Sequence, residues 1–226
     1  VEVQGIELVI RCLRERVHAG GVGLALLDLR DAKACEHLVE MGALKHLFPL
    51  FSGKSLPRPF STTKKARKRW KSKLEGHLVQ IIYNLTRFLT DASPKDAKQR
   101  VLVKFVEDGC AKCNRLVELL LEYDSRARKA EYAFFRSDVE ESLPEGQTEW
   151  AALEAKLRGG GDVLHRLSAI CAFVCVGSRK CHEHLLEHLT KQDAGMGLVK
   201  AALQEFVSVL DDGDQKTQLE EYLRQI

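Results

Sequence analysis

Apolar residues recur three or four positions apart along most of the chain, a spacing that places them on one side of an α-helix. The first stripe covers positions 3 to 17 and consists of Val3, Ile6, Val9, Ile10, Leu13 and Val17. A glycine cluster at positions 20 to 23 ends this predicted helix, and a second run begins at Leu24. Helix is therefore the dominant signal from the start.

One glycine interrupts the next apolar face. That face consists of Leu38, Val39, Leu44, Leu47, Phe48, Leu50 and Phe51. Gly42 separates its first two members from the rest, so it predicts a tight break between two helices. Pro49 has no backbone N–H to donate, and it predicts a kink or an end in the second helix.

A loop and then a long helix are predicted next. Positions 52 to 63 contain a glycine, two prolines and several Ser and Thr residues, which is typical of a loop. The following helix begins in a run of Lys and Arg residues and continues through Leu78, Ile82, Leu85 and Leu89. We expect the first half of this helix to be exposed and the second half to be buried.

The pair Ser93–Pro94 is typical of a helix start, with serine as the N-cap and proline at the first helical position. This predicted helix carries an apolar face at positions 101 to 106 and ends at Gly109. Another helix covers positions 110 to about 135, with an apolar face formed by Leu116, Leu119, Leu120 and Tyr123.

The C-terminal half contains two breaks. Positions 137 to 149 hold five acidic residues, one proline and one glycine, which predicts an acidic loop or a short surface helix. Gly159–Gly161 predict a hinge between two helical blocks, and Asp162 is placed to cap the next helix. That helix is predicted to be the most buried of this half. Three amphipathic helices follow, at His182–Leu189, Leu198–Leu210 and Gln215–Ile226.

Consecutive helices with short breaks favour stacking of helical pairs into a solenoid, because each unit buries its apolar stripe against its neighbours. Similar segments begin at Gly5, Gly42 and Gly109, which are 37 and 67 residues apart, so the repeat is irregular. The predicted fold is all-α. It is an armadillo- or HEAT-like right-handed superhelix, an irregular α-solenoid that forms one domain over residues 1–226.

Charge is segregated along the chain. The formal net charge is only +3, from 35 basic and 32 acidic residues, which excludes a generally cationic binder of nucleic acid. Nine Lys or Arg residues and no acidic residue lie between Lys54 and Lys73, so the rest of the chain carries −6. The sequence thus predicts an acidic body with a basic loop and helix start at positions 52 to 73.

The basic segment has three interpretations. Its density is that of a nuclear localisation signal formed by Lys64, Lys65, Arg67, Lys68, Arg69, Lys71 and Lys73. It can equally be a solvated helix end beside a loop. The third interpretation is a contact of positions 54 to 73 with RNA phosphates, for which Phe60 and Trp70 are available for stacking.

Catalytic chemistry has no starting point in this sequence. The motifs GxxxxGK[ST], GxGxxG, GxSxG and HExxH are absent, so the sequence predicts neither an enzyme nor a cofactor. Seven cysteines, an odd number, favour buried thiols in a reducing compartment, and the start of the chain lacks the pattern of a signal peptide. The nearly apolar run Ala169–Val176 is too short to span a membrane.

Two weaker patterns involve cysteine. Cys110 and Cys113 form a single CxxC outside any βαβ context, so helix-packed thiols are favoured over a redox pair. Cys181, His184 and His188 share a helix face, which would suit zinc if Cys175 or His182 completed the set. Structural zinc sites usually draw ligands from two elements, so no metal site is predicted here.

Five segments resemble one family in its order: Val1–Glu7, Cys35–Phe51, His77–Leu89, Arg115–Leu119 and Leu164–Ile170. On these residues the chain resembles the C-terminal half of the beta-catenin-like protein 1 family, nuclear armadillo-like proteins associated with pre-mRNA splicing. Leu47–Phe51, with the sequence LFPLF, is the most specific segment. The link Arg16–Leu24 is much shorter than that of the family, in which additional helices lie.

The resemblance implies a non-enzymatic scaffold in the nucleus that belongs to spliceosomal complexes and binds basic, localisation-signal-like segments of splicing factors. Armadillo carriers bind such segments through a ladder of Trp and Asn, which two Trp and two Asn residues cannot form here. An acidic surface would have to replace the ladder, and its candidates are Glu107, Asp108, Glu118 and Glu122. The alternative function is RNA contact through the basic segment, and the oligomeric state stays open.

Overall fold

The computed structural model describes residues 3–15, 24, 29–54, 56, 63–137 and 147–226. Within these ranges every regular element is a helix and there is no strand. The α-helices are α1 (Val3–Arg14), α3 (Ala32–Glu40), α4 (Leu44–Phe51), α5 (Lys64–Phe88), α6 (Ala97–Phe135), α7 (Thr148–Lys156), α8 (Asp162–Gly177), α9 (Arg179–Thr190), α10 (Met196–Ser208) and α11 (Asp214–Gln225). A short 3-10 helix, η1 (Pro94–Asp96), precedes α6, and a π-helical turn, η3 (Leu157–Gly161), joins α7 to α8. The predicted all-α fold of stacked helices is confirmed.

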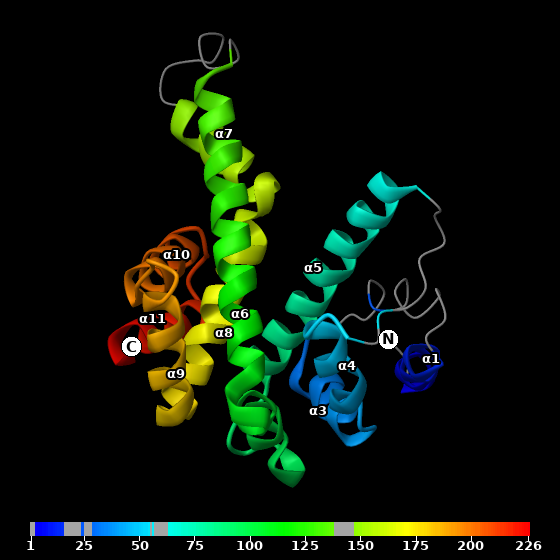
Figure 1. The fold of residues 1–226 in the computed structure, drawn as a ribbon. Helices are drawn as coiled ribbons and strands as arrows, with labels where there is room; N and C mark the ends of the chain where they lie inside the picture. Colours follow the sequence, from blue (N-terminus) through cyan, green and yellow to red (C-terminus); the bar gives the residue numbers. More distant parts are fainter. Residues whose placement is uncertain (1–2, 16–23, 25–28, 55, 57–62, 138–146) are drawn as a thin grey trace.

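Two helices form the centre of the molecule. The long helix α6 runs through the structure, and α8 lies beside it and also packs against α5, α9, α10 and α11 (Figure 1). All residues from Leu167 to Cys175 are buried, so α8 is the core helix that the sequence predicted. The helical stretch Thr148–Gly177 is apolar and long enough to cross a membrane, but 78% of its most apolar window is buried within the protein. Its apolar character is that of a core helix.

Gly42 joins α3 to α4 through a turn whose backbone requires glycine. Its φ is +75°, and its N–H donates to Val39 O while Ala43 N–H donates to Leu38 O. This pair of bonds is the Schellman arrangement that ends a helix. The predicted break is therefore confirmed, but Pro49 does not end α4, which continues to Phe51.

Helix α5 begins at the predicted basic run. Thr63 caps it by accepting a hydrogen bond from Ala66 N–H at 3.3 Å. From Leu74 onwards the helix contributes to the core, with buried Leu78, Ile82 and Leu85. Its first turns point away from α6 and α8 in Figure 1. The expected exposed first half and buried second half are both confirmed.

The predicted end at Gly109 appears as a break inside α6. Asp108, Gly109 and Cys110 all have φ between +54° and +64°, which interrupts the helix before it continues to Phe135. Ser93 lies at the N-cap position with Pro94 as the first helical residue, as predicted, but the helix that they open is the short η1 and the Ser93 side chain makes no capping hydrogen bond. Its Oγ accepts a hydrogen bond from Thr90 N–H, which lies before it in the chain, and the α-helix begins only at Ala97.

The three glycines before α8 are closely packed. Gly160 and Gly161 are buried, and a Cβ added at Gly159 would overlap Ala130 Cβ of α6. Asp162 does not cap α8 as predicted: it has helical φ and ψ as the first residue of α8, and its carboxylate pairs with Arg166 at 2.9 Å. Glycine is thus needed here for close approach of two helices, and a hinge motion stays a prediction.

Several predicted features lie outside the described residues. They are the glycine cluster at positions 20 to 23, most of the short link at 16 to 24, much of the loop at 52 to 63 with Phe60, and most of the acidic segment at 137 to 149. The three C-terminal amphipathic helices are described, and α9, α10 and α11 confirm them.

Candidate interaction surfaces

The N-terminal part of α5 is a surface of Lys and Arg side chains, which we call the cationic end of α5. All seven predicted members are exposed: Lys64, Lys65, Arg67, Lys68, Arg69, Lys71 and Lys73. Within the described part of the chain, Lys71 reaches Glu75 at 3.8 Å, whereas Lys64, Lys65, Lys68 and Arg69 form no ion pair. Trp70 lies on the opposite, half-buried side and packs against the core.

A network of charged side chains fixes α5 to α6 just after this end. Arg115 of α6 pairs with Glu75 of α5 at 3.0 Å and with Glu118 of α6 at 2.9 Å. Burial raises the pKa of Glu75, while Arg115 opposes that shift. On α5, Ser72 lies one turn before Glu75, and its Oγ accepts a hydrogen bond from Arg126 of α6 at 3.1 Å; the Arg126 guanidinium also stacks over the Tyr123 ring. These contacts hold the cationic end in place relative to the core.

A pocket of about 400 Å³ continues the basic surface between α5 and α8. Its lining includes Lys73, His77 and Gln80 of α5 together with Asp162 and Arg166 of α8. Burial and the neighbouring Lys73 lower the pKa of His77, so this ring is neutral at pH 7. The positive charge of the pocket therefore comes from Lys73 and from Arg166, and the Arg166 guanidinium also forms an ion pair with Asp162.

The predicted acidic surface is mostly neutralised by neighbouring cations. Glu107 accepts from Lys104 at 2.8 Å, Asp108 accepts from Lys112 at 2.6 Å, and Glu118 accepts from Arg115. Glu122 is exposed and has no ion pair among the described residues. Of the four candidate residues, Glu122 is thus the one without an ion pair in the described part of the chain, and Glu118 lies four residues before it. That these carboxylates bind a partner stays a prediction.

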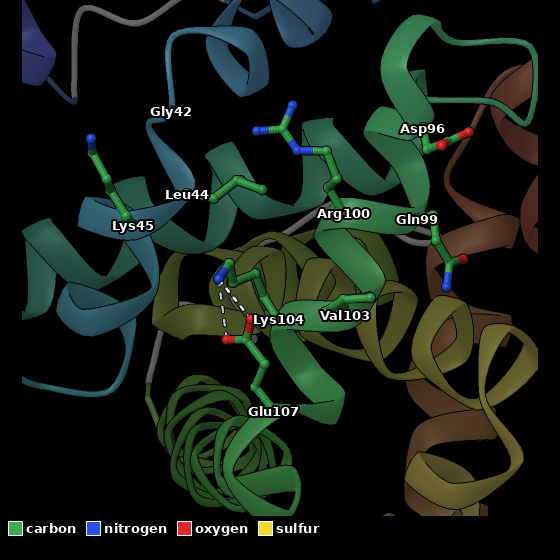
Figure 2. A pocket seen from close by; sticks show the side chains of 9 residues that line it. All are labelled: Gly42, Leu44, Lys45, Asp96, Gln99, Arg100, Val103, Lys104 and Glu107. Carbon is green, nitrogen blue, oxygen red and sulfur yellow. Dashed lines mark hydrogen bonds and ion pairs between the residues drawn. The ribbon is translucent and has the colours of Figure 1, made fainter.

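A second pocket, of about 450 Å³, lies between the α3–α4 turn and the first half of α6 (Figure 2). Leu44 and Val103 provide apolar surface, and the side chains of Lys45, Arg100 and Lys104 lie around it. Arg100 also donates to Val39 O at 3.1 Å, which ties α6 to the end of α3. Sequence reasoning missed this pocket because its residues come from positions 60 apart and carry no motif.

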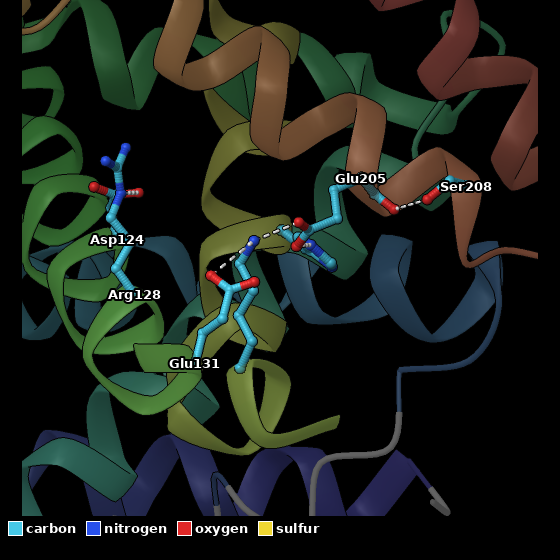
Figure 3. Close-up of polar contacts among 7 residues, drawn as sticks. Asp124, Arg128, Glu131, Glu205 and Ser208 are labelled. Carbon is cyan, nitrogen blue, oxygen red and sulfur yellow. Dashed lines mark hydrogen bonds and ion pairs between the residues drawn. The ribbon is translucent and has the colours of Figure 1, made fainter. Parts of the chain in front are cut away.

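A partly buried polar network connects α8, α10 and α7, and it too was missed. Glu205 of α10 lies 2.9 Å from His165 Nε2 of α8 and also accepts from Lys156 of α7. Glu131 of α6 lies on the other side of this lysine, and it faces Glu205 in Figure 3. Hydrogen bonding by His165, and then by Lys156, lowers the pKa of Glu205 to about 2. The network fastens the C-terminal helices to the centre.

Five of the seven cysteines are buried on α6, α8 and α9, whereas Cys12 belongs to α1 and Cys35 to α3. Cys110 Sγ is 3.8 Å from Cys181 Sγ, and Cys113 and Cys171 are also buried. Burial raises the pKa of Cys110, Cys113 and Cys171, and that of Cys175 to about 12, which disfavours the reactive thiolate form.

The two histidines considered as zinc ligands, His184 and His188, make other contacts. His184 bonds to Asn114 Oδ1 at 2.6 Å, and its ring stacks on that of His188. In the ranges that the structure describes, no group of three His, Cys, Asp or Glu side chains could hold a metal ion.

Comparison with known proteins gives one result that bears on this arrangement. No curated protein matches the chain. The model of one protein family, described as catenin-beta-like, Arm-motif containing nuclear, matches residues 1–204. This match extends from α1 into α10 and includes both pockets, the cationic end of α5 and the carboxylates of α6. The chain therefore belongs to the catenin-beta-like family of Arm-motif containing nuclear proteins.

Proposed function

We propose that this protein is a protein-interaction scaffold of nuclear pre-mRNA splicing complexes, and that it binds basic segments of splicing factors. The observation that carries the proposal is the family match over residues 1–204, in a chain whose described part consists of stacked helices. Arm-motif proteins are typically non-enzymatic, and stacked helices offer long surfaces for partners. That the chain is not an enzyme stays a prediction.

Nuclear localisation is supported by the description of the family, which names nuclear proteins. The interpretation of Lys64–Lys73 as a localisation signal stays a prediction. Carriers bind such signals as extended chain, whereas these residues form capped helix here. The first turns of α5 would therefore have to unwind before a carrier could bind them.

The surface for a basic segment is centred on Glu118 and Glu122. They are four residues apart and therefore lie on one face of α6. A lysine or arginine of a partner could pair with Glu122 directly, and it would compete with Arg115 for Glu118. Because the Glu118 side chain is still 58% exposed, such competition does not require the helix to move.

Titration of a fluorescent lysine- and arginine-rich peptide into the purified protein tests this assignment. We expect Glu118→Gln with Glu122→Gln to weaken binding by about tenfold, since each exposed charge pair contributes about 0.2–1 kcal/mol. The matched control is Asp211→Asn with Glu220→Gln, two exposed acidic residues near the C-terminus that form no ion pair among the described residues. Equal affinity of the two variants would remove Glu118 and Glu122 from the binding surface.

A further inference from the structure

We propose that the cationic end of α5 binds the phosphate backbone of single-stranded RNA. The proposal adds a second, independent surface to the scaffold function. It concerns residues 64–73 and the pocket below them, and it does not depend on which protein partners bind elsewhere.

The first argument is the availability of the charges. Lys64, Lys65, Lys68 and Arg69 are exposed, and they have no acidic partner among the described residues. On the neighbouring helix α6, by contrast, most cations form ion pairs with carboxylates, among them Lys104, Lys112 and Arg115. The free charge of this part of the molecule is thus concentrated on two turns of one helix.

The second argument is that cations in the first turns of α5 are electrostatically unfavourable for the helix itself. The N-terminus of a helix carries the positive end of the backbone dipole, which disfavours cations there. Helix α5 has no acidic residue in its first turn, and like charges lie four residues apart at Lys64/Lys68 and at Lys65/Arg69. A residue pattern that works against its own helix indicates a function, and a bound polyanion would cancel both repulsions.

The third argument separates RNA from an acidic protein. Protein interfaces are centred on large apolar or aromatic side chains. The described part of the cationic end exposes no such residue, because Trp70, its sole aromatic, packs against the core. Long, flexible cations without an apolar anchor suit a phosphate backbone, which is bound mainly through charge.

The surroundings allow a strand to continue past the helix. The first turns of α5 point away from α6 (Figure 1), and their Lys and Arg side chains are exposed. Below them, the pocket between α5 and α8 adds the cation of Lys73, the amide of Gln80 and the guanidinium of Arg166. Phosphates bound by Lys65 and Arg69 would thus lead towards a hollow with these three donor groups, in which a phosphate would compete with Asp162 for Arg166.

The test measures binding of fluorescein-labelled U20 RNA to the full chain by fluorescence anisotropy between 50 and 200 mM salt. The variant carries Lys64→Gln, Lys65→Gln, Lys68→Gln and Arg69→Gln. Its charge-matched control carries four exposed cations from other helices: Lys33→Gln, Arg179→Gln, Lys180→Gln and Lys191→Gln. Far-ultraviolet circular dichroism confirms that both variants are folded.

We expect the wild-type affinity to fall steeply with salt. Neutralising four phosphate-binding cations should reduce the slope of log K against log salt by about 3, at roughly 0.7 per phosphate for a single strand. The affinity at 50 mM salt should fall at least tenfold, while the control keeps the wild-type slope. A dT20 strand should bind with similar affinity, since the cations contact phosphates and not the 2′-hydroxyl.

Two results would overturn the proposal. One is an equal loss in both variants, or no RNA binding by the wild type, because the surface would then have no special affinity for the backbone. The other is tighter binding of poly-glutamate of the same charge, which would assign the cationic end to an acidic protein.

Discussion

At the scale of single residues, the buried contacts of Glu205 explain how the C-terminal helices are held. His165 is almost completely buried, and its ring both stacks on Phe206 and bonds to the Glu205 carboxylate. Lys156 completes the network from a third element. If the Glu205 carboxylate is removed, the buried His165 ring loses its hydrogen-bond partner. Leaving a buried polar group unpaired destabilises a protein by more than the net free energy that the hydrogen bond itself contributes.

We predict that Glu205→Gln destabilises the protein by about 1.5–3 kcal/mol, the range for hydrogen bonds to charged groups. The lowered pKa of Glu205, about 2, makes this contribution dependent on pH. A carboxyl group with a depressed folded-state pKa adds stability above its unfolded value near 4.5, and that stability is lost as pH falls towards 2. The free energies of unfolding of wild type and variant, measured with urea, should therefore become more similar as pH falls from 4.5 towards 2. A difference that stays constant from pH 7 to pH 3 would contradict the role given to the carboxylate.

Gly159 gives a second prediction at this scale. Its added Cβ would overlap Ala130 of α6, so Gly159→Ala should destabilise the protein by about 1–3 kcal/mol, as overpacking does. Gly197 in α10 is the matched control, since nothing lies within 4 Å of its added Cβ. Gly197→Ala should be neutral or stabilise by about 0.5 kcal/mol. Thermal unfolding compares the two, and equal effects would argue against close packing at Gly159.

At the scale of elements, the sequence predicted those helix boundaries and buried faces that depend on residues close together in the chain. Gly42 marked its turn because a positive φ favours glycine, and the apolar spacing after Leu74 marked the buried half of α5. Ser93 has the predicted N-cap position, but in the short η1 and without a side-chain cap bond. Asp162 was misassigned as a cap, because α8 already begins at Asp162 and Gly161 has the N-cap position. The Glu205 network could not be predicted, because its partners are 40 and 49 residues away in the sequence.

The same difference applies to the candidate surfaces. The basic run was visible in the sequence because its charges are consecutive, and the structure leaves most of them exposed. The carboxylates of α6 were equally visible, but the cations that pair with Glu107, Asp108 and Glu118 are set by helix register and by the break at positions 107 to 110. Ion pairing with neighbouring side chains, which the sequence did not reveal, therefore distinguishes the two surfaces: in the described part of the chain most of the α6 carboxylates are paired, and most of the α5 cations are not.

Helix α5 yields a prediction that separates stability from binding. Lys64→Glu with Lys65→Glu places acidic residues in the first turn, where the helix dipole favours them by about 0.3–1 kcal/mol each. We expect slower amide hydrogen exchange in the first turns of α5, together with weaker RNA binding. Faster exchange would show that the lysines stabilise the helix, and the functional interpretation of their placement would be lost.

At the scale of the whole molecule, α6 and α8 form one core from which the possible interaction surfaces extend. The cationic end of α5 is joined to α6 beside Glu118, because Ser72 contacts Arg126 and because Arg115 pairs with both Glu75 and Glu118. The C-terminal helices α10 and α11 pack against α8, and α11 also contacts α5 through the hydrogen bond from Gln215 to Tyr83. This arrangement suits a scaffold, since partners bound at separate surfaces are held at fixed positions by a shared core.

The most direct measurement of the scaffold function is affinity purification of the tagged chain from native nuclear extract, with quantitative mass spectrometry of the recovered proteins. A helical protein of similar size and net charge serves as the control bait. The account predicts that spliceosomal proteins with basic segments are enriched over this control and are still recovered after ribonuclease treatment. Spliceosomal proteins recovered no more strongly than with the control bait would contradict it.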